Sequence, residues 1–405
     1  MKIVYVTPRV PYPPNRGDKI RSYHILRHLC RDHEVHVVSL VDRAQDLRWS
    51  ETLEEMCASV SLRRIDRIAG AGRALRSLSR GDPMVAALFA APRLRRTVRE
   101  VCANDTDVLW IYNGALYPNL TGIPALRTVV DLVDVDSDKW LQMAAAADPL
   151  RAALYHREAR ATRAQEDFAL GAADACIVVS AEESRVLNQG RACADSLHVV
   201  GNGVDLASFP ANPLTREPTI LFTGVLDYAP NIDAVLHFAA DILPLVRSRV
   251  TGARFVAAGG RPPRRLLRAA RDYRFEVVAD VDDIRPHFAA ARVFVAPMRL
   301  SRGVLNKILE AMAGGVPVVA TPRALVGHAP WHEEIASCAG TPGEFADACV
   351  ALLTDDARAE RMAAAALRFV SRRHRWDDTY ASIDAILSSL CGSAPARAVA
   401  GSASR

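Results

Sequence analysis

The chain has 405 residues, of which 50% are hydrophobic and 24% charged, and its formal net charge is +5. This composition excludes a globally disordered chain, and at roughly 100–200 residues per domain the length predicts two domains. The eight cysteines form no CxxC pair, which is typical of a reduced, cytosolic protein.

The chain begins directly with a β-branched run, so we expect no signal peptide. No apolar run approaches the roughly 18 residues needed to span a bilayer, so any membrane contact is expected to be peripheral. Short apolar runs alternate with longer helical patterns, which predicts βαβ units and a doubly wound α/β fold with parallel strands. The predicted strands are Ile3–Thr7, Val35–Leu40, Val108–Tyr112, Thr128–Leu132, Ala175–Val179, Leu197–Val200, Thr219–Phe222, Arg254–Ala258, Val293–Ala296 and Val316–Ala320.

The loop after the first strand is the first candidate site. Gly17 allows close backbone approach to a ligand, and Asp18, Lys19 and Arg21 follow it at the start of a predicted helix. A helix N-terminus with nearby cations favours anions, and ligands of open α/β sheets bind at this edge. The alternative is an ordinary proline-rich loop, since no GxGxxG fingerprint is present.

Residues 63–99 are unusually basic, with ten arginines against Asp66 and Asp82. Apolar residues are interleaved, so the segment predicts either an amphipathic face for anionic lipid or a solvated helical face. The interleaved apolar residues are Leu75, Leu78, Val85, Leu88 and Phe89.

Four acidic residues alternate through the segment 131–138, directly after a predicted strand. Alternating carboxylates could chelate a hard cation, or they could cap the helix that starts near Lys139. We predict a role at the catalytic edge without metal, because the second half of the chain offers another way to neutralise phosphate.

Glycine and proline interrupt the pattern over residues 201–213, which predicts a linker between domains. We expect an N-terminal domain over 1–204 and a C-terminal domain over 205–375. A helix over 376–391 is expected to pack back on the N-terminal domain, and a flexible tail follows over 392–405.

The strongest candidate site lies in residues 297–321. A buried strand leads into a loop with Gly303, Val304 and Leu305, then a helix with Lys307 and Glu310, then another buried strand. Backbone N–H groups of this loop, with Arg302 and Lys307, can neutralise a diphosphate. Glu310 shares a helix face with Lys307 and can accept hydrogen bonds from ribose hydroxyls. For that pair alone, a surface Lys–Glu contact is the simpler interpretation.

The run Lys307–Val319 resembles the donor-site motif of glycosyltransferase family 4, and Asn202–Asp205 followed by Phe209 resembles its linker motif. Thr223-Gly224 falls where that family continues its C-terminal domain, so Gly224 joins the expected donor site. A narrower resemblance, over Pro11–Tyr23, Asp134–Trp140 and Thr223–Asn231, is to a bacterial sugar transferase subgroup associated with exosortase/PEP-CTERM and exopolysaccharide loci. The resemblance implies a GT-B fold, a nucleotide-sugar donor held by the C-terminal domain, and retention at the anomeric carbon.

The chain departs from the family pattern at several positions. Arg302 stands where the family has its first Glu, while Val225 and Asn231 stand where many relatives have an Arg and a Lys. We therefore expect Arg302 and Lys307 to supply the diphosphate cations. The family's sugar-facing His is absent, which leaves Asp131 or Asp134 for that place.

We therefore expect a hexosyltransferase that moves a sugar from a UDP- or GDP-sugar to a saccharide or lipid-linked acceptor in bacterial cell-surface glycan synthesis. We expect no cofactor, no metal and no nucleic-acid partner. The predicted location is cytoplasmic, with peripheral contact at the inner face of the membrane through residues 63–99. Two alternatives remain open: a non-catalytic scaffold, and a sugar-nucleotide epimerase, which would convert the donor without an acceptor.

Overall fold

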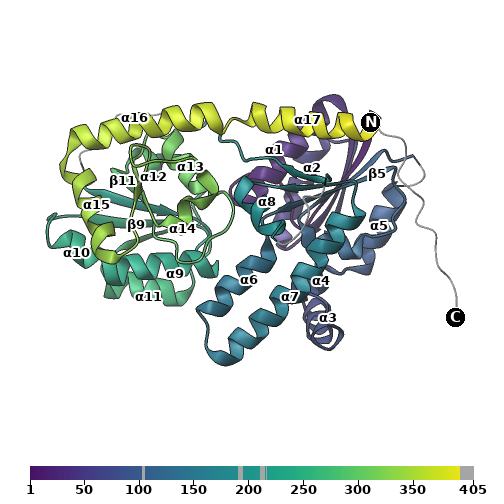
Figure 1. Cartoon of the computed structure of the whole chain (residues 1–405), viewed down its shortest axis with the longest axis horizontal. Helices are drawn as coiled ribbons and strands as arrows, with labels where there is room; N and C mark the ends of the chain where they lie inside the picture. Colours follow the sequence, from purple (N-terminus) through teal and green to yellow (C-terminus); the bar gives the residue numbers. More distant parts are fainter. Residues whose placement is uncertain (103–104, 190–194, 210–214, 216, 393–405) are drawn as a thin grey trace.

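The computed structural model describes residues 1–102, 105–189, 195–209, 215 and 217–392. They form two α/β halves that lie side by side, with two long helices running along one edge of both (Figure 1). The predicted linker falls partly outside the described residues, at 210–214. Of the predicted tail, only Gly392 is described, as the last residue of a helix.

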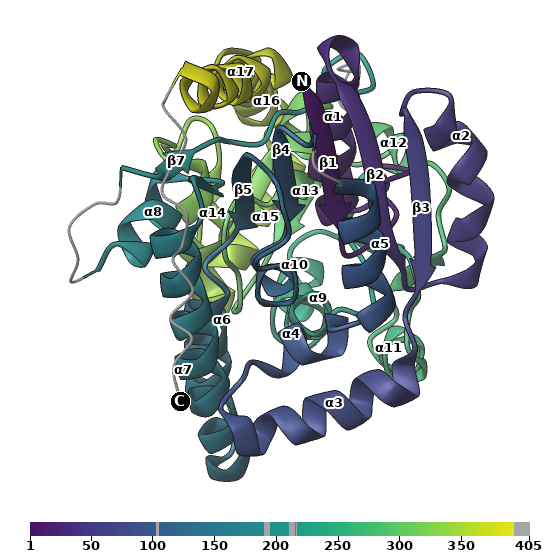
Figure 2. The same ribbon diagram turned by 90° about the vertical axis from the view of Figure 1, so that its right-hand side faces the viewer.

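The N-terminal half holds a seven-stranded sheet in the order β3-β2-β1-β4-β5-β6-β7, and every pairing is parallel (Figure 2). The central strands are mostly buried and apolar because helices cover both faces. The strands are β1 (Lys2–Thr7), β2 (Glu34–Val41), β3 (Ser59–Arg64), β4 (Val108–Tyr112), β5 (Arg127–Val133), β6 (Ala175–Val178) and β7 (Leu197–Val199).

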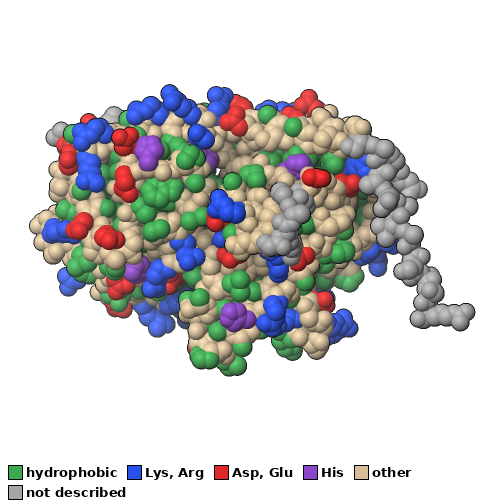
Figure 3. Space-filling model, viewed as in Figure 1, with side chains coloured by type: hydrophobic (Ala, Val, Ile, Leu, Met, Phe, Trp, Pro, Cys, Tyr) green, Lys and Arg blue, Asp and Glu red, His purple; other side chains and the backbone are tan. Residues whose placement is uncertain are grey.

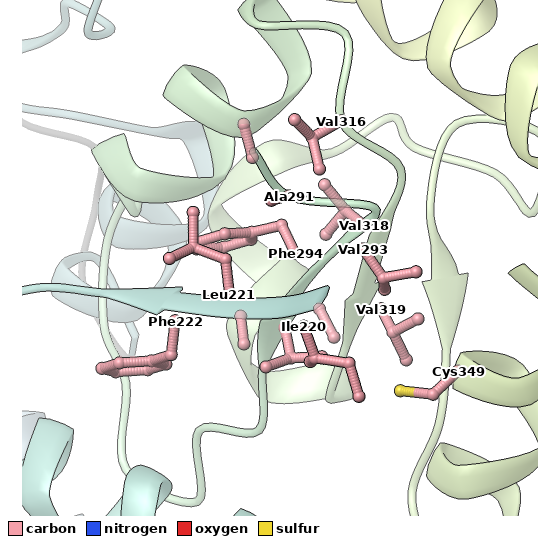
Figure 4. Close-up of a cluster of buried hydrophobic side chains, with 14 of the residues drawn as sticks. Ile220, Leu221, Phe222, Ala291, Val293, Phe294, Val316, Val318, Val319 and Cys349 are labelled. Carbon is pink, nitrogen blue, oxygen red and sulfur yellow. The ribbon is translucent and has the colours of Figure 1, made fainter. Parts of the chain in front are cut away.

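The C-terminal half holds a six-stranded parallel sheet in the order β10-β9-β8-β11-β12-β13. Figure 4 shows its core, where side chains of β8, β11 and β12 pack together near Cys349. The strands are β8 (Thr219–Thr223), β9 (Arg254–Gly259), β10 (Glu276–Ala279), β11 (Val293–Ala296), β12 (Val318–Ala320) and β13 (Ser337–Cys338).

All ten predicted strands are present, and the prediction of two doubly wound parallel sheets is confirmed. Three strands were not predicted: β3, β10 and β13. Each lies at an edge of its sheet, and β3 and β10 have no fully buried residue. The strands β3 and β10 carry mixed polar and apolar residues, and β13 has only two residues, so these three lack the continuous apolar run that marks a central strand.

Helices cover both sheets. Those of the N-terminal half are α1 (Gly17–Asp32), η1 (Ala44–Trp49), α2 (Ser50–Glu54), α3 (Arg67–Arg80), α4 (Met84–Phe89), α5 (Pro92–Cys102), η2 (Gly114–Asn119), α6 (Asp136–Ala145), α7 (Pro149–Ala172) and α8 (Ala181–Leu187). The others are α9 (Ala229–His237), η3 (Phe238–Ile242), α10 (Leu243–Arg247), α11 (Arg264–Asp272), α12 (Arg285–Ala289), α13 (Asn306–Ala313), α14 (Pro322–Leu325), η4 (Val326–His328), α15 (Pro342–Thr354), α16 (Asp356–Arg373) and α17 (Trp376–Gly392).

One helical segment, Ala229–Arg247, is long and apolar enough to pass a length-and-composition test for crossing a membrane. Our expectation that no run approaches this length is therefore corrected. This segment spans α9, η3 and α10, and Ile232, Val235 and Phe238 are buried in it. Burial against the C-terminal sheet accounts for its hydropathy.

Helices α16 and α17 carry the chain from the C-terminal half back to the N-terminal half (Figure 1). Trp376 stacks on His24 of α1 with ring centroids 4.1 Å apart, and Tyr380 stacks on His28 at 4.3 Å. Ile383, Ile386 and Leu387 join the hydrophobic core beneath the N-terminal sheet. The end of the chain thus fastens the two halves together on the side opposite α6 and α7.

Candidate active site

A cavity of about 840 Å³ lies between the two halves and is lined by both. Its walls are loops at the carboxyl ends of parallel strands, including the loops after β1, β5, β8 and β9. Open α/β sheets bind ligands at this edge, where loops and helix starts bring polar groups together. The cavity is therefore the place to look for every predicted site residue.

The C-terminal wall gathers Gly224, Asn231, Lys307 and Glu310. Lys307 Nζ donates a hydrogen bond to Asn231 Oδ1 at 2.8 Å and lies 4.1 Å from the centre of the Phe222 ring. Asn231 stands where relatives of the resembled family have a lysine, and Lys307 reaches the same spot from α13. The cation at this wall is thus Lys307 of α13, whereas the position of Asn231 lies on α9.

Lys307 and Glu310 both have strongly shifted pKa values. Burial lowers the pKa of Lys307 to about 7, although Glu310 opposes the shift. Burial raises the pKa of Glu310 to about 7, although Lys307 opposes that shift. A ligand anion beside Lys307 would favour its charged form, so this pair is prepared to respond to a bound phosphate.

Gly224 brings bare backbone to the cavity wall. A Cβ at Gly224 would lie 2.8 Å from Lys307 Nζ, and a Cβ at Gly259 would lie 1.8 Å from the Gly224 carbonyl oxygen. Only glycine fits at both positions, so the loops after β8 and β9 approach each other without side chains. This leaves room for a ligand against the main chain.

Arg302 bridges the two halves instead of standing free. Its Nη1 lies 2.9 Å from Asp138 Oδ2 of α6, and its Nη2 lies 2.9 Å from Glu183 Oε1 of α8. Although Arg302 lines the cavity, both carboxylates already neutralise it. In this conformation Arg302 holds the loop against the N-terminal half, and its expected role as a diphosphate cation stays a prediction.

The same loop uses two of its three predicted donor N–H groups internally. Gly303 N donates to Glu183 Oε1 at 3.1 Å, and Leu305 N donates to His328 Nε2 at 3.2 Å. Val304 and Leu305 line the cavity, but Gly303 is not among the lining residues. Protein acceptors already occupy the N–H groups of Gly303 and Leu305, and the donor-binding role of this loop stays a prediction.

Asp134 lines the cavity, whereas Asp131 does not. Burial, with the neighbouring Glu183 and Asp136, raises the pKa of Asp134 to about 7. Asp134 also contacts the Gly303 backbone, where φ is +62° and a Cβ would lie 1.8 Å from Asp134 Oδ1. Of the two candidates for the sugar-facing acid, the geometry favours Asp134.

Asp131 and Arg21 form an ion pair in the interior of the N-terminal half. Arg21 Nε donates to Asp131 Oδ2 at 2.9 Å, and Arg21 Nη1 donates to Val200 O and to Asn202 Oδ1. Arg21 is 1% exposed and Asp131 is fully buried. Asp131 is not among the residues that line the cavity, so its expected site role is corrected. Arg21 does line the cavity, and its role in donor binding stays a prediction. The pair ties α1 and β5 to the segment that leaves β7.

The other predicted residues of the first loop also include one that lies outside the cavity and one that lines it. Lys19 Nζ lies 3.0 Å from Asp46 Oδ2 and is buried outside the cavity lining, which corrects its expected role. Asp18 does line the cavity, with Arg9 and Arg16 both within 2.8 Å of its oxygens. Although burial opposes it, Arg16 and Arg9 hold the pKa of Asp18 below its usual value.

Gly17 lines the cavity and accepts a hydrogen bond across it, from Asn306 Nδ2 at 3.3 Å. Asn202 Nδ2 donates to the same Asn306 side chain at 3.0 Å. The start of α13 is thus tied to both the first loop and the linker.

One cavity residue, Glu166, had no signal in the sequence. Glu166 of α7 accepts from Ser137 N at 3.0 Å and from Ser137 Oγ, and burial raises its pKa to about 7. Lys139 lies 3.5 Å from Asp136 and 5.5 Å from the Tyr228 ring across the cavity. Glu166 lies within a long helix with no motif, so only its burial identifies it.

The acidic segment 131–138 is largely paired with protein cations. Asp131 pairs with Arg21, Asp136 with Lys139 and Asp138 with Arg302. Among the residues that the structure describes, no group of three or more His, Cys, Asp or Glu side chains is arranged to hold a metal ion. Metal independence itself stays a prediction.

Comparison with known proteins points to one family for the C-terminal half. Residues 217–355, which include Gly224, Lys307 and Glu310, match the family described as Glycosyl transferases group 1. Over 216 residues the chain is 29% identical to the GDP-mannose-dependent alpha-(1-6)-phosphatidylinositol monomannoside mannosyltransferase of two Mycobacterium tuberculosis strains, CDC 1551 / Oshkosh and ATCC 25618 / H37Rv. The match covers 47% of this chain and 55% of the relative, so the chain spans about half the length of the curated relatives it matches.

Solved structures match over both halves. Sucrose-phosphate synthase from Thermosynechococcus elongatus superposes with a TM-score of 0.69 at 15% identity, covering 96% of this chain and 99% of that chain. Anabaena HepE in complex with UDP and glucose superposes with a TM-score of 0.66 at 17% identity, covering 96% of this chain and 100% of that chain. S. aureus TarM superposes with a TM-score of 0.69 at 10% identity, covering 96% of this chain and 100% of that chain. These likenesses show the GT-B fold. The group 1 domain and the mannosyltransferase relatives support the prediction of a hexosyltransferase.

Proposed function

We propose that this protein transfers a hexose from a nucleoside diphosphate to a saccharide or lipid-linked acceptor in cell-surface glycan synthesis. The observation that carries the proposal is that Lys307 and Glu310, both half-buried, lie in the family-matched region and line the cavity between the halves. A UDP- or GDP-sugar is proposed as the donor, because HepE binds UDP and the mannosyltransferase relatives are GDP-mannose-dependent. The exopolysaccharide role rests on the resemblance over Pro11–Tyr23 and Thr223–Asn231.

The donor roles follow from charge and reach. Lys307 Nζ, beside the backbone of Gly224, is proposed to bind the diphosphate, since an ammonium is the natural partner of phosphate oxygens. Glu310, one helical turn along the same face, is proposed to accept hydrogen bonds from the ribose hydroxyls. No further cofactor is proposed.

Bond breaking puts negative charge on the leaving diphosphate, and a fixed cation stabilises that charge as it develops. Lys307 supplies the cation, so the proposed reaction needs no metal. We propose retention at the anomeric carbon: the acceptor hydroxyl attacks from the face that the diphosphate leaves, and a leaving phosphate oxygen takes its proton. Asp134, at the opposite wall, is proposed to face the sugar, and Arg302 to hold the loop before α13 in position.

The proposed place of work is the cytoplasm. Six cysteines are free in the structure: Cys30, Cys57, Cys102, Cys176, Cys338 and Cys349. Free cysteines of this kind are typical of a cytosolic protein.

The test is thermal stabilisation by UDP, GDP and their sugar conjugates, with and without EDTA, on wild type and Glu310→Ala. A ligand that binds only the folded protein stabilises it by RT ln(1 + [L]/Kd) and so raises Tm. We expect UDP or GDP to raise Tm, EDTA to leave the rise unchanged, and Glu310→Ala to abolish it. A folded wild type that no nucleotide stabilises would contradict the proposal and favour a scaffold, and turnover of the donor without acceptor would favour an epimerase.

A further inference from the structure

Helix α3 is apolar on two opposite faces. Its buried face consists of the small residues Gly70, Ala74 and Ser77, which pack toward α4 and α7. Arg73 Nε donates to Ala87 O of α4 at 3.2 Å, and Arg157 of α7 donates to Ser77 O. The helix is therefore anchored to the N-terminal half through its small side chains.

The outward face of α3 carries the larger apolar side chains. Ile68, Ala71, Gly72 and Leu75 follow the spacing i, i+3, i+4 and i+7, which is the stripe that a surface helix normally turns to the core. Here the stripe faces solvent: Ile68 is 89% exposed and Leu75 is 71% exposed. Leu78, one turn further on, is 39% exposed.

Cations surround this stripe. Three of the ten arginines of residues 63–99 have structural partners: Arg63 bonds Thr97, Arg73 bonds α4, and Arg95 bonds Asn119 and Thr121. Six others are exposed, and within the described part of the chain none of them pairs with a carboxylate: Arg64, Arg76, Arg80, Arg93, Arg96 and Arg99. Arg76 and Arg80 lie on α3 itself, beside the apolar stripe.

Figures 1 and 2 both place α3 and the turn between α6 and α7 at the lower edge of the N-terminal half. That turn adds Leu150, which is 83% exposed. Figure 3 shows hydrophobic and basic side chains next to one another along this edge. The next helix, α4, lies between this edge and the cavity, where it presents Val85 and Phe89. These two residues, which the sequence grouped with a lipid face, line the cavity instead.

We propose that α3, with the turn between α6 and α7, docks on an anionic lipid bilayer. Apolar side chains that project from a helix flanked by arginines enter the headgroup region, and the arginines pair with anionic lipid headgroups. The contact places the Val85–Phe89 wall of the cavity next to the bilayer surface. Resting on the proposed function, it gives the acceptor a class: a sugar or hydroxyl headgroup carried on a membrane lipid, which enters past α4.

The experiment is cosedimentation of the full chain with vesicles of phosphatidylcholine alone, or of phosphatidylcholine with phosphatidylglycerol. We expect binding to the anionic vesicles only. The paired substitutions Ile68→Ser with Leu75→Ser, and Arg76→Gln with Arg80→Gln, are each expected to lower the partition coefficient roughly 10-fold or more. The control for the arginine variant is Arg361→Gln with Arg368→Gln on α16, which runs along the opposite edge. The control for the apolar variant is Leu245→Ser at a half-exposed position on α10. Neither control is expected to change vesicle binding.

Equal loss in the α16 control would overturn the proposal, because binding would then follow net charge alone. A failure of the wild type to bind anionic vesicles would also overturn it. So would a wild-type dimer that becomes monomeric in the Ile68→Ser, Leu75→Ser variant, since a second copy of the chain would then cover the stripe. Nucleotide stabilisation, measured on the same samples, distinguishes the membrane proposal from the proposed function. If vesicle binding fails while UDP or GDP still raises Tm, only the membrane proposal is overturned. If the vesicles bind the protein but no nucleotide raises Tm, only the proposed function is contradicted.

Discussion

The two walls of the cavity compensate charge differently. On the C-terminal wall, Lys307 has a neutral hydrogen-bond partner, Asn231, and its nearest carboxylate influence is Glu310. On the N-terminal wall, Arg9 and Arg16 share Asp18, while beneath it Arg21 holds Asp131. A buried charge without a full protein counterion is costly, so its retention indicates a ligand. A buried charge that is fully paired within the protein indicates a structural role.

The largest expected effect would test the structural side of this comparison. Arg21→Met leaves Asp131 fully buried without its cation, and removing one partner of a buried pair costs about 3–5 kcal/mol. We expect that loss in the free energy of unfolding, measured by urea denaturation. Arg249→Met, which breaks the exposed pair with Asp347, is the control and is expected to change stability by less than about 0.5 kcal/mol. Equal effects would mean that the Arg21 pair contributes no more than a surface contact.

The second-largest effect would test whether Lys307 on the C-terminal wall binds the diphosphate. Lys307→Met removes the only cation that we assign to the diphosphate, and loss of one transition-state contact lowers turnover by about 10²–10³-fold. We expect this loss in a nucleotide-release assay, with the Tm of the free protein unchanged or raised, because a half-buried amine without a full counterion is gone. Lys2→Met, which removes a lysine at the amino end of β1 and outside the cavity lining, is the control. Turnover near wild type in Lys307→Met would move the diphosphate site elsewhere.

A third variant would test whether the walls depend on each other. Gly303 has φ +62° and its backbone touches Asp134, so Gly303→Ala introduces a clash and a left-handed alanine costing about 1–2 kcal/mol. We expect a lower Tm and, in solution scattering, a larger radius of gyration as the halves separate. Gly171→Ala, where an added Cβ meets nothing within 4 Å, should leave both quantities unchanged or raise Tm slightly. An unchanged Gly303→Ala would mean that the contact between halves is not required.

The smallest effect is on pH dependence. In the free protein the pKa of Lys307 is lowered to about 7, and a bound diphosphate raises it again, so binding takes up a proton above pH 7. Glu310, whose pKa is raised to about 7, must lose a proton below that pH to accept ribose hydroxyls. We therefore expect affinity for UDP or GDP to peak near pH 7 and to weaken by up to about 10-fold per pH unit on either side.

Calorimetric titration over this pH range would check both limbs separately. Lys307→Met should remove the alkaline limb and keep the acid one, and Glu310→Gln should remove the acid limb. A flat profile in the wild type would mean that neither group changes its protonation when the nucleotide binds.

The sequence alone determined much of this protein, because the relevant signals are local. Continuous apolar runs identified every strand buried on both faces, and alternation with helices predicted the two sheets. The segment Lys307–Val319 identified the wall that carries Lys307 and Glu310, since glycines and the helix start must stand at fixed spacing to form it. Residue type and spacing are sufficient wherever one element, or two consecutive elements, make the feature.

Only the tertiary structure decided which charges are free. Lys19 finds Asp46 at a separation of 27 residues, Arg21 finds Asp131 at 110, and Gly303 finds Glu183 at 120. No local pattern encodes such contacts, because each group is ordinary in its own element: a charged side chain or, at Gly303, a backbone N–H. The same limit applies to α3, whose apolar stripe reads as core from its spacing. Its outward direction follows from the small residues that the fold turns inward.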